Sequence, residues 1–499
     1  MKKFIVLGSG TAGLIAATMI KKTWKDKVQV SLYYDSNKKN IGVGESTTPS
    51  ISYFLRTFLN VDFYDFLKDT GSTIKLGINF KNWIPKTQFF HGFQEVDIDD
   101  ALYPESLYSI LNGDYAGGIN YNKPSTTLPN HGLNFLHALH IDTQAFSTYV
   151  HERIKNHIEI VDDVAEKVIV DGENIKSIIF KNSGEVSADF YIDASGFNEV
   201  LIKHLNSKKI DISKYLPIDR AIPQQIEYDF VEVPSYTEAE ATKNGWIWKI
   251  PIGNRYGTGY TYSSKFTTDE DAKKDYDKWL NDNFNVNLET DKIIKYSPGY
   301  YEDHWVGNCM AVGLSSGFIE PLEATGIHLI VMQMKDFIEY NITLKNLNYN
   351  RVECNRRNAA LYKEILEFVC LHYNTNRTDS EFWKYMTDNK LDWVKCFDEK
   401  CREEFLEKFS IEKGKEFWHV DSYIQVAQGL EMFNPEALKN YIDLLPNGEQ
   451  ILERCRSRHE SMKMSKQMGL NVPHRSILNG NIIQFSQVDL NINDRIRFV

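Results

Sequence analysis

Basic residues are scarce relative to acidic residues in this chain. Its 499 residues include 57 Lys and Arg against 68 Asp and Glu, which gives a formal net charge of −11. The basic residues form no Lys/Arg-rich block beyond short mixed stretches. Because an acidic protein repels phosphate backbones, we expect no nucleic-acid partner.

Cysteine pairs at metal-binding spacing are also missing. The six cysteines include no C-x-x-C pair, and no nearby histidine stands at zinc spacing. We therefore expect reduced thiols in a cytoplasmic protein, and no metal site.

Long apolar runs do not occur either. No segment approaches the roughly 20 apolar residues that a membrane-spanning helix requires. The apolar N-terminal stretch is interrupted by Gly8-Ser9-Gly10, so it lacks the continuous apolar region of a signal peptide. Neither a membrane span nor a secretion signal is expected.

The residues that are present suit a large globular enzyme. The composition is 42% hydrophobic, 13% aromatic and 25% charged. A chain of this length can bury a sizeable core and form two or three domains, or one large domain with an insertion.

The first 35 residues carry a nucleotide-binding pattern. A short apolar strand, Phe4 to Leu7, leads directly into Gly8-Ser9-Gly10-Thr11-Ala12-Gly13 and an amphipathic helix, Leu14 to Trp24. A second strand, Val28 to Tyr34, ends at Asp35, the place of a ribose-binding acid. In this pattern the glycines permit a tight turn, close approach of a pyrophosphate and close helix packing, so the sequence predicts a dinucleotide site.

Later segments predict further elements. Trp305 to Gly313 is read as a strand that runs to a turn, and Val331 to Leu344 as a helix. Ser72 to Phe80 alternates like a strand and places Lys75 among apolar neighbours, where a surface lysine would be the ordinary interpretation. Ile158 to Phe190 reads as a meander broken by glycine-containing turns. Asn244 to Ser264 reads as a hairpin whose Trp246 and Trp248 share one face, which is either core or the wall of a cavity.

Four motifs together resemble one family, the flavin-dependent halogenases of the tryptophan-halogenase type. They are W-x-W-x-I-P at 246–251, G-V-G-E-S-T-T-P at 42–49, D-A-S-G at 193–196 and E-P-L-E-A-T-G-I at 320–327. The resemblance covers about residues 1–435 and implies an α/β fold of the glutathione-reductase-like FAD-binding type. It also implies an FAD-binding and halogenation module over 1–345, with a β-rich insertion at about 83–300, and a mainly helical region over 346–499 that completes the substrate site.

The resemblance implies a role for each site residue. Lys75 would present the halogenating species, and Glu323 would face the substrate. The cofactor-binding residues would be Gly8, Gly10, Thr11, Ala12, Gly13, Asp35, Gly44, Glu45, Ser46, Thr47, Gly313 and Ile327. The halide would bind at Thr325 and Gly326, the substrate at His91, Phe93, Phe417, Trp418 and Tyr423, and the tunnel wall would be Trp246, Trp248 and Pro251. The aromatic residues among these also fit an ordinary core.

Two departures from the family pattern stand out. Ala324 replaces a serine in the E-P-L-E-S-T-G-I block. Residues 405–413 lack the tyrosine pair that grips the charged backbone of tryptophan, and Lys413 stands near the place of the accompanying glutamate. Free tryptophan is therefore not assumed to be the substrate, and the preferred halide is left open among chloride, bromide and iodide.

The resemblance implies that reduced FAD, oxygen and halide give hypohalous acid, which Lys75 delivers to an electron-rich, indole-like aromatic. No second G-x-G-x-x-G with strand context occurs, so a separate NAD(P)H flavin reductase would supply FADH2. Two alternatives stay open, a single-component flavin monooxygenase that hydroxylates an aromatic and a non-catalytic FAD-binding redox protein. A homodimer is likewise left open.

Overall fold

The computed structural model describes residues 1–38, 45–93, 127–129, 137–288, 292–403, 417–467 and 471–474. These residues divide into two compact units that alternate along the chain. Unit 1 comprises residues 1–72, 138–219 and 295–363, and unit 2 comprises residues 73–137, 220–294 and 364–499. The predicted division into a module over 1–345 and a helical region over 346–499 follows sequence order and not these contacts, and it stays a prediction.

Unit 1 is built on a sheet with the spatial order β21-β22-β13-β1-β2-β9. Its strands are β1 (Lys2–Leu7), β2 (Val28–Tyr34), β9 (Glu159–Asp162), β13 (Phe190–Asp193), β21 (Trp305–Val306) and β22 (Cys309–Ala311). From β22 to β9 each strand pairs in parallel with the next, and β21 pairs antiparallel with β22. A parallel sheet must be covered on both faces, because its strands carry apolar side chains on both.

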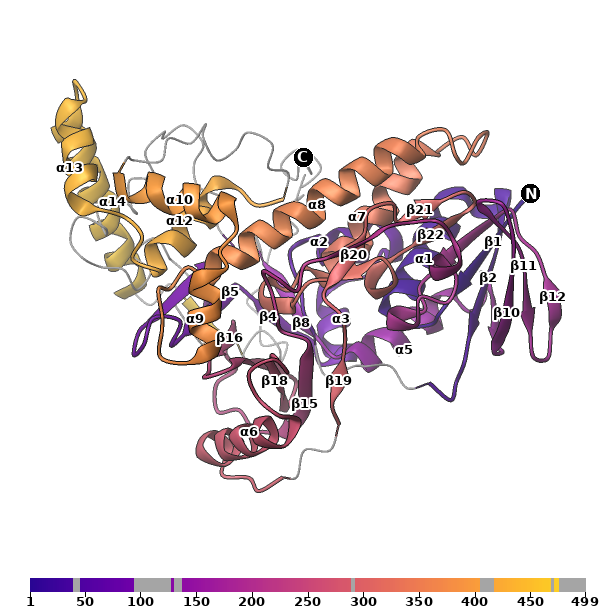
Figure 1. The fold of residues 1–499 in the computed structure, drawn as a ribbon, viewed down its shortest axis with the longest axis horizontal. Coiled ribbons are helices and arrows are strands. Elements are labelled where there is room, and N and C mark those ends of the chain that lie inside the picture. The colour runs from indigo at the N-terminus through magenta and orange to yellow at the C-terminus, as the bar shows by residue number, and fades with distance from the viewer. Residues whose placement is uncertain are drawn as a thin grey trace. The chain divides into compact units, whose positions relative to one another are not determined.

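Helices cover one face of this sheet. They include α1 (Thr11–Trp24) and α7 (Thr325–Tyr340), which pack against each other. Phe4 of β1 contacts Trp24 at the end of α1 and Phe337 of α7, with ring centroids 5.8 and 6.4 Å apart. Figure 1 shows α1 and α7 on the same side of β1 and β2.

A small antiparallel sheet covers the other face. It contains β10 (Ala165–Asp171), β11 (Asn174–Phe180) and β12 (Gly184–Val186). Ile5 and Leu7, which alternate with the helix-facing residues of β1, share a core cluster with Ile178 and Phe180 of β11. The predicted meander is thus confirmed, although β9 and β13 at its two ends belong to the parallel sheet.

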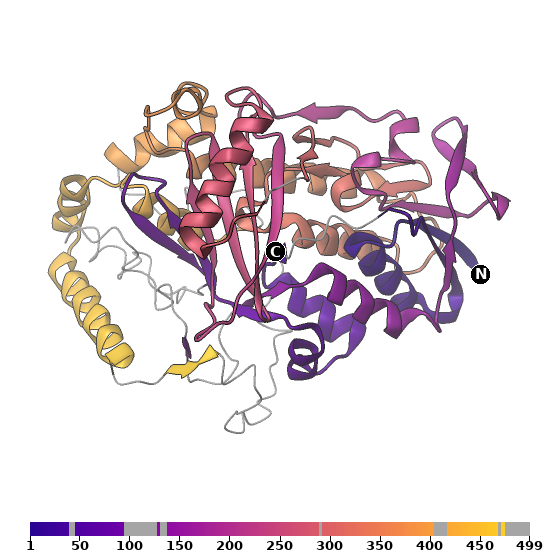
Figure 2. The ribbon, with the colours of Figure 1, turned by 90° about the horizontal axis from the view of Figure 1, so that it is seen from below.

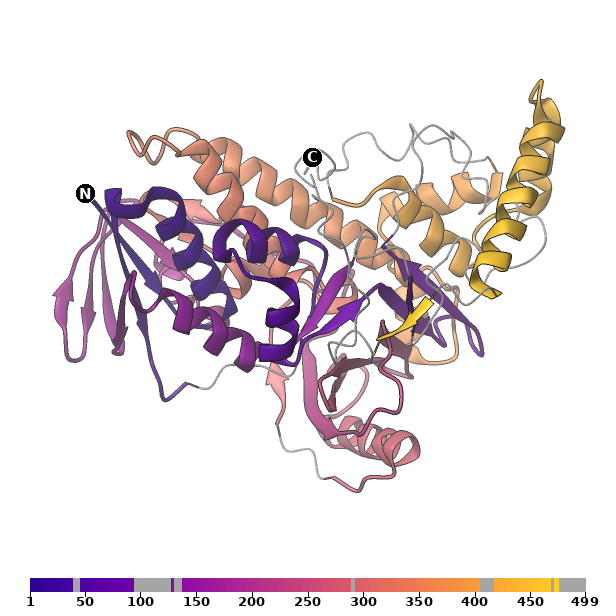
Figure 3. The same cartoon turned by 180° about the vertical axis from the view of Figure 1, so that it is seen from behind.

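The remaining described elements of unit 1 are short. They are η1 (Lys25–Lys27), β3 (Glu45–Ser46), α2 (Ser50–Phe54), η2 (Leu55–Leu59), α3 (Phe63–Thr70), β8 (Ala138–Ile141), α5 (Thr143–Ile154), η3 (Gly196–Asn198), η4 (Ile202–His204), β14 (Lys209–Asp211), β20 (Gly299–Tyr301), η5 (Gly313–Ser315), β23 (Gly317–Phe318) and η6 (Pro321–Glu323). Helices α1 and α5 are both visible in Figure 3. Helix α8 (Arg351–His372) crosses the boundary between the units in sequence.

A mostly antiparallel sheet has the spatial order β19-β15-β18-β17-β16-β5-β6. Apart from β19 (Ile294–Lys295), which crosses the boundary between the units in sequence, its strands belong to unit 2. The bounds are β15 (Arg220–Glu227), β18 (Arg255–Tyr262), β17 (Gly245–Ile252), β16 (Thr237–Ala241), β5 (Gly77–Lys81) and β6 (Gln88–Gly92). Helix α6 (Asp269–Phe284) lies across one face, as Figure 2 shows, and buries Tyr276 and Leu280 against Ile247 and Tyr260. The predicted hairpin of β17 and β18 is confirmed in full register.

The other described elements of unit 2 are β4 (Thr73–Lys75), β7 (Thr127–Pro129), α9 (Glu381–Asp388), α10 (Asp392–Glu403), α12 (Val420–Gly429), α13 (Pro435–Leu444), α14 (Gly448–Gln467) and β24 (Asn471–Pro473). Strands β24 and β7 pair antiparallel. Among the described residues, no helix is both long enough and apolar enough to span a bilayer.

The sequence predictions for the first strand, helix and second strand are confirmed, and the mixed α/β class with them. One prediction was wrong in detail: residues 305–313 do not form a single strand. Gly307 has a φ of +52°, and the chain turns there, so that Trp305 pairs with Met310 in a short hairpin. A second prediction placed a helix start at Val331, whereas α7 begins at Thr325.

Candidate functional site

The turn between β1 and α1 depends on two of its glycines. Gly8 has a φ of +120°, and a Cβ added there would lie 2.3 Å from the carbonyl oxygen of Ala194. A Cβ at Gly13 would lie 1.8 Å from the carbonyl oxygen of Gly8. Any larger residue would therefore separate the helix from the sheet.

The N-terminus of α1 is available to an anion. Gly10 occupies the N-cap, no side chain caps the helix, and no acidic residue lies in its first turn, which begins with Thr11 and Ala12. The exposed N–H groups and the helix dipole favour a phosphate at this position. Asp35 follows β2, where its carboxylate accepts a hydrogen bond from the backbone N–H of Asn37 at 3.0 Å.

A second turn, at Gly313, lies against the first. Gly313 has a φ of +60°, and a Cβ there would lie 3.0 Å from the Cβ of Ala12. Asp193, at the end of β13, is fully buried and accepts hydrogen bonds from the backbone N–H groups of Leu201 and Ile202 at 2.7 and 2.9 Å. The D-A-S-G segment, the first glycine turn and Gly313 thus meet at the carboxyl ends of adjacent parallel strands, the usual position of a nucleotide.

The described part of the second glycine-rich loop pairs with β8. Glu45 lies opposite Ile141, and Ser46 lies opposite His140. Desolvation in its surroundings raises the pKa of Glu45 to about 7, although part of its surface stays accessible. Thr47 donates a hydrogen bond from its hydroxyl to Leu139 at 2.7 Å. Gly44, predicted to bind the cofactor, lies outside the described residues.

The same loop contacts the start of α7. The hydroxyl of Thr48 lies 2.9 Å from that of Ser50 and 3.5 Å from Nδ1 of His328. Burial, and secondarily the charge of Lys335, lowers the pKa of His328 to about 3, so its imidazole is neutral. Two of the motifs that suggested a flavin site are therefore linked by hydroxyl and imidazole groups.

The start of α7 has the properties of an anion site. Its N-cap residue, Ala324, makes no side-chain cap and has a φ of 58°, which is unusual for a residue with a Cβ. No acidic residue lies in the first turn, and a Cβ added at Gly326 would meet open space. Thr325 and Gly326 therefore present backbone N–H groups at an uncapped helix end. Glu323, immediately before it, and Ile327, within it, are both buried.

Lys75 is a buried lysine in unit 2. Its side chain is 0% exposed, which is rare for lysine, and its Nζ lies 5.1 Å from the ring centroid of Phe93. Surface exposure, the ordinary alternative for this lysine, is excluded. Lys75 and Glu323 belong to different compact units, and their joint action stays a prediction.

Four of the five predicted substrate residues meet in an aromatic cluster around Phe368 in unit 2. The ring of Phe368 stacks on Trp418 with centroids 4.1 Å apart and lies edge-on to His91 at 5.6 Å and to Tyr423 at 4.9 Å. Phe417 contacts Trp418 at 4.1 Å. Residues distant in sequence thus form one wall.

Two polar side chains that sequence reasoning missed hold this wall. The buried carboxylate of Glu364 accepts hydrogen bonds from the backbone N–H groups of Phe417 and Trp418, at 3.1 and 3.0 Å. Gln425 accepts a hydrogen bond from the backbone N–H of Gly92 at 2.9 Å. A usable signal existed for Glu364, because it precedes Phe368 by one helical turn on a buried face. For Gln425 no sequence signal identifies the partner.

The tryptophan hairpin has the arrangement that the alternation predicts. The rings of Trp246 and Trp248 are neighbours, with centroids 6.2 Å apart. A Cβ at Gly259 would lie 2.2 Å from the ring of Trp248, so this glycine makes room for the indole. Within the described part of the chain, no hydrogen-bond partner reaches the buried Nε1–H of Trp248. The carbonyl of Pro251 accepts a hydrogen bond from Thr73, two residues before Lys75, at 2.7 Å.

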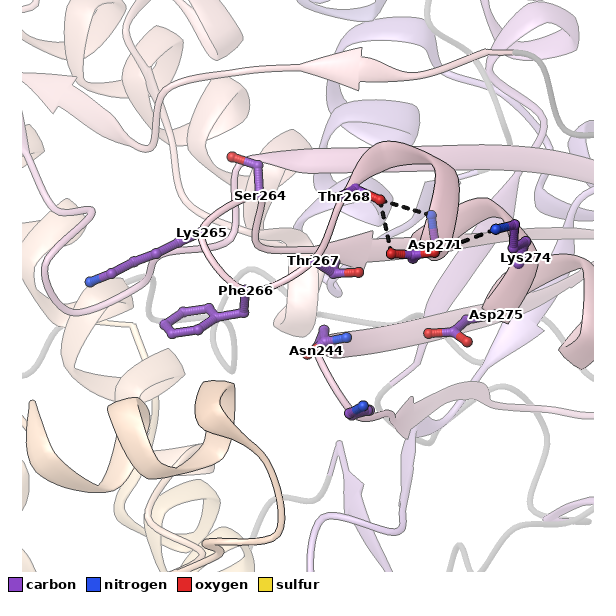
Figure 4. A pocket seen from close by; sticks show the side chains of 10 residues that line it. Asn244, Ser264, Lys265, Phe266, Thr267, Thr268, Asp271, Lys274 and Asp275 are labelled. Atoms are coloured by element: carbon purple, nitrogen blue, oxygen red, sulfur yellow. Dashed lines mark hydrogen bonds and ion pairs between the residues drawn. The ribbon is translucent and has the colours of Figure 1, made fainter.

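An open cavity of about 610 Å³ lies elsewhere in unit 2, at the start of α6. Figure 4 shows its polar lining, in which the Thr268 hydroxyl accepts from the backbone N–H of Asp271, and Asp271 pairs with Lys274 at 3.5 Å. None of the predicted site residues lines it. Over the described ranges, no three His, Cys, Asp or Glu side chains are grouped as metal ligands would be.

The residues of unit 1 fit a bound FAD. Two glycines leave space that a Cβ would fill, an uncapped helix faces the same turn, and an acid follows the second strand. This is the donor set that a pyrophosphate and a ribose need.

Comparison with known proteins gives consistent matches. A family model described as "Tryptophan halogenase" matches residues 3–447. Tryptophan 6-halogenase SttH of Streptomyces toxytricini is 28% identical over 424 residues, which cover 77% of this chain and 80% of that protein. Tryptophan 7-halogenase RebH of Lentzea aerocolonigenes is 28% identical over 429 residues, covering 78% and 79%.

A solved structure shares the fold. Tar14, a tryptophan C-6 flavin-dependent halogenase (chlorinase) from taromycin biosynthesis, superposes with a TM-score of 0.83 at 24% identity, covering 96% of this chain and 100% of that one.

Proposed function

The chain belongs to the tryptophan halogenase family, and on this premise we propose that it is a flavin-dependent halogenase acting on an electron-rich, indole-like aromatic. The observation that carries the proposal is the buried amine of Lys75 beside Phe93. A flavin protein that only hydroxylated its substrate, or only carried electrons, would have no need of this costly burial.

FAD would be held by the residues of unit 1. The turn from Gly8 to Gly13 and the N-terminus of α1 would bind its pyrophosphate, and Asp35 its ribose. When bound and reduced, FAD supplies with oxygen the oxidising equivalent that turns halide into hypohalous acid. Glu45, Ser46 and Thr47 are proposed to line the flavin, where the strand pairing with β8 fixes their backbone.

The halide would bind at the start of α7. The N–H groups of Thr325 and Gly326 point out of an uncapped helix whose first turn carries no acid. An anion there would be stabilised by the helix dipole as well as by hydrogen bonds. Ala324 offers no hydroxyl at this position, and we propose that the site favours the more easily oxidised bromide or iodide over chloride.

Lys75 would present the electrophile to the substrate. Its ammonium can donate a hydrogen bond to hypohalous acid. After losing a proton, its amine can attack the halogen of hypohalous acid, so that the halogen–oxygen bond breaks and a haloamine and water form. Glu323 would accept the proton that leaves the halogenated ring carbon. The Trp246 and Trp248 wall would exclude water along the route, with Trp248 Nε1–H as a donor within it.

The substrate would be an aromatic ring held by His91, Phe93, Phe417, Trp418 and Tyr423. The aromatic rings that Glu364 and Gln425 help to hold would provide flat apolar surface for such a ring. Because residues 405–413 lack the tyrosine pair, we propose an indole other than free tryptophan. Lys413 and its neighbours lie outside the described residues.

Reduced flavin would come from a separate NAD(P)H-dependent reductase, since no second nucleotide motif occurs in the sequence. The purified chain with FAD and NADH alone should therefore give no product. Turnover under those conditions would remove the reductase from the proposal.

Product mass spectrometry tests the function as a whole. The chain is supplied with FAD, a generic flavin reductase, NADH and a panel of indoles and phenols, with chloride, bromide or iodide in turn. Halide-dependent mass gains are expected, largest with bromide or iodide. Oxygen incorporation without halide would instead indicate a monooxygenase, and no product from any panel member would favour a non-catalytic flavoprotein.

A further inference from the structure

The backbone from Ile74 to Ile78, which includes Lys75 at the end of β4, runs beside residues 233–237, and a parallel ladder begins where β5 meets β16. Within the sheet, Ile78 of β5 lies opposite Thr237 of β16. Two residues upstream on each side, the backbone N–H of Leu76 donates to the carbonyl of Ser235 at 2.7 Å. The same register would place Ile74 opposite Val233.

Between Ile74 and Val233, a side chain takes the place of the direct backbone hydrogen bond. Pro234 has no N–H to offer the ladder, and residues 231–236 are not part of a strand. The imidazole of His474 bridges the two chains instead. Its Nε2 accepts a hydrogen bond from the backbone N–H of Ile74 at 3.0 Å, and its Nδ1 lies 3.3 Å from the carbonyl oxygen of Val233.

These two partners determine which nitrogen of the imidazole carries a proton. The N–H of Ile74 requires an unprotonated Nε2, and the carbonyl of Val233 requires a proton on Nδ1. His474 is 0% exposed, and burial lowers its pKa to about 4 despite the opposing hydrogen bond to Val233. The ring is therefore neutral near pH 7 and able to make both bonds.

His474 lies beyond the part of the chain, about residues 1–435, that the family resemblance covers. It directly follows β24, the yellow strand visible in Figure 3, and β24 is itself anchored by pairing with β7. The imidazole is thus connected to the paired strands β24 and β7 through its own backbone, and to the strand of Lys75 through its hydrogen bond.

We propose that His474 is a positioning residue for Lys75, which this C-terminal segment supplies to the halogenation site. The inference rests on the proposed function of Lys75. The bond at Ile74 fixes the backbone immediately before Lys75, while Thr73 is held by Pro251 and Leu76 by Ser235. Without the imidazole, the amide of Ile74 loses its partner, and the amine of Lys75 is no longer held in place.

Two substitutions separate positioning from packing. In His474→Gln the amide oxygen can take the place of Nε2 and accept from Ile74. In His474→Asn the shorter amide can reach only the place of Nδ1, so the bond to Val233 is kept and the bond to Ile74 is lost. Exposed His157, changed to Asn, is the matched control.

The first readout does not depend on activity. Hydrogen exchange followed by mass spectrometry on peptides that contain the Ile74 amide should show wild-type protection in His474→Gln and reduced protection in His474→Asn. Equal protection in the two variants would overturn the assignment of the Ile74 bond, whether or not the chain proves to be a halogenase.

The second readout is kcat with the substrate found by mass spectrometry, alongside the Kd for FAD. We expect His474→Asn to lower kcat by about 10- to 100-fold, as misplacement of a catalytic group does, with an unchanged Kd for FAD and substantial recovery in His474→Gln. Lost protection at Ile74 with wild-type kcat would overturn the positioning role. Absence of any halide-dependent product from the wild type would be a failure of the proposed function alone.

Discussion

Ligand contacts in unit 1 are expected mainly from the backbone, whereas those in unit 2 are expected from side chains. The glycine turns and helix N-termini of unit 1 offer N–H groups whose positions follow from the local chain path. In unit 2, the backbone beside Lys75 and the aromatic wall donates hydrogen bonds to Glu364, Gln425 and His474, which are far away in sequence. A sequence motif therefore specifies a site made of backbone N–H groups almost completely, and a site made of side chains only in part.

Substitutions in unit 1 should therefore act through the backbone, and the largest effect is expected at Gly8. Gly8→Ala adds a Cβ 2.3 Å from the Ala194 carbonyl at a φ of +120°. We expect loss of FAD binding, measured by flavin fluorescence titration, and a lower Tm.

The control for Gly8 is Gly172→Ala, in the turn between β10 and β11. Gly172 also has a positive φ, +59°, but a Cβ there would meet nothing within 4 Å. Gly172→Ala should lower the free energy of unfolding by only about 1 kcal/mol and leave FAD binding intact. Equal effects of the two changes would mean that backbone conformation alone, and not close approach to Ala194, makes Gly8 necessary.

In unit 2 the largest effect is expected at Lys75. Lys75→Met keeps most of the side-chain volume and removes the amine, so the buried site should not collapse. Product formation should fall by more than about 1000-fold, the upper range for a positioned proton-transfer group, while the Kd for FAD is unchanged. Lys167→Met, on the exposed face of β10, is the control and should show wild-type product formation and FAD affinity.

An intermediate effect is expected at Glu364, which touches no proposed ligand. The N–H groups of Phe417 and Trp418 reach the same oxygen of Glu364, and Glu364→Gln replaces this charged acceptor with a neutral one. Loss of a charge-assisted bond of about 1.5–3 kcal/mol predicts a KM for the aromatic substrate raised about 10- to 100-fold. A steady-state series with exposed Glu381→Gln as control checks this, and a changed FAD affinity would contradict it.

The smallest effect concerns the pH dependence of stability. The pKa of Glu45 is raised from 4.5 to about 7, so the folded chain binds more protons than the unfolded chain between these values. The contribution of Glu45 therefore lowers the free energy of unfolding as pH rises from about 4.5 to 7. Denaturant unfolding across this range measures the change in the free energy of unfolding with pH. In Glu45→Gln this free energy should decline less steeply, or rise more steeply, than in the wild type. An unchanged slope would show that the carboxyl is not desolvated in the folded state.

The same contrast explains what the sequence could predict. The elements in residues 1–35 were all predicted, because each follows from neighbours in the chain, and the second strand was predicted to the residue. The first strand and the helix begin two and three residues earlier than predicted. The short hairpin at Gly307 was missed, because an apolar run does not reveal that one glycine takes a left-handed conformation. His474 was missed because its partner, Ile74, is 400 positions away and only the folded chain brings them together.

The most direct test of delivery through Lys75 compares where oxidised bromide goes in wild type and in Lys75→Met. Each protein receives FAD, a flavin reductase, NADH, bromide, the aromatic substrate and a soluble thioether that traps free hypobromite. The wild type is expected to give brominated aromatic. Lys75→Met is expected to give oxidised thioether and almost no brominated aromatic, while it uses oxygen at a rate similar to that of the wild type. Undiminished aromatic bromination by Lys75→Met would contradict delivery through Lys75.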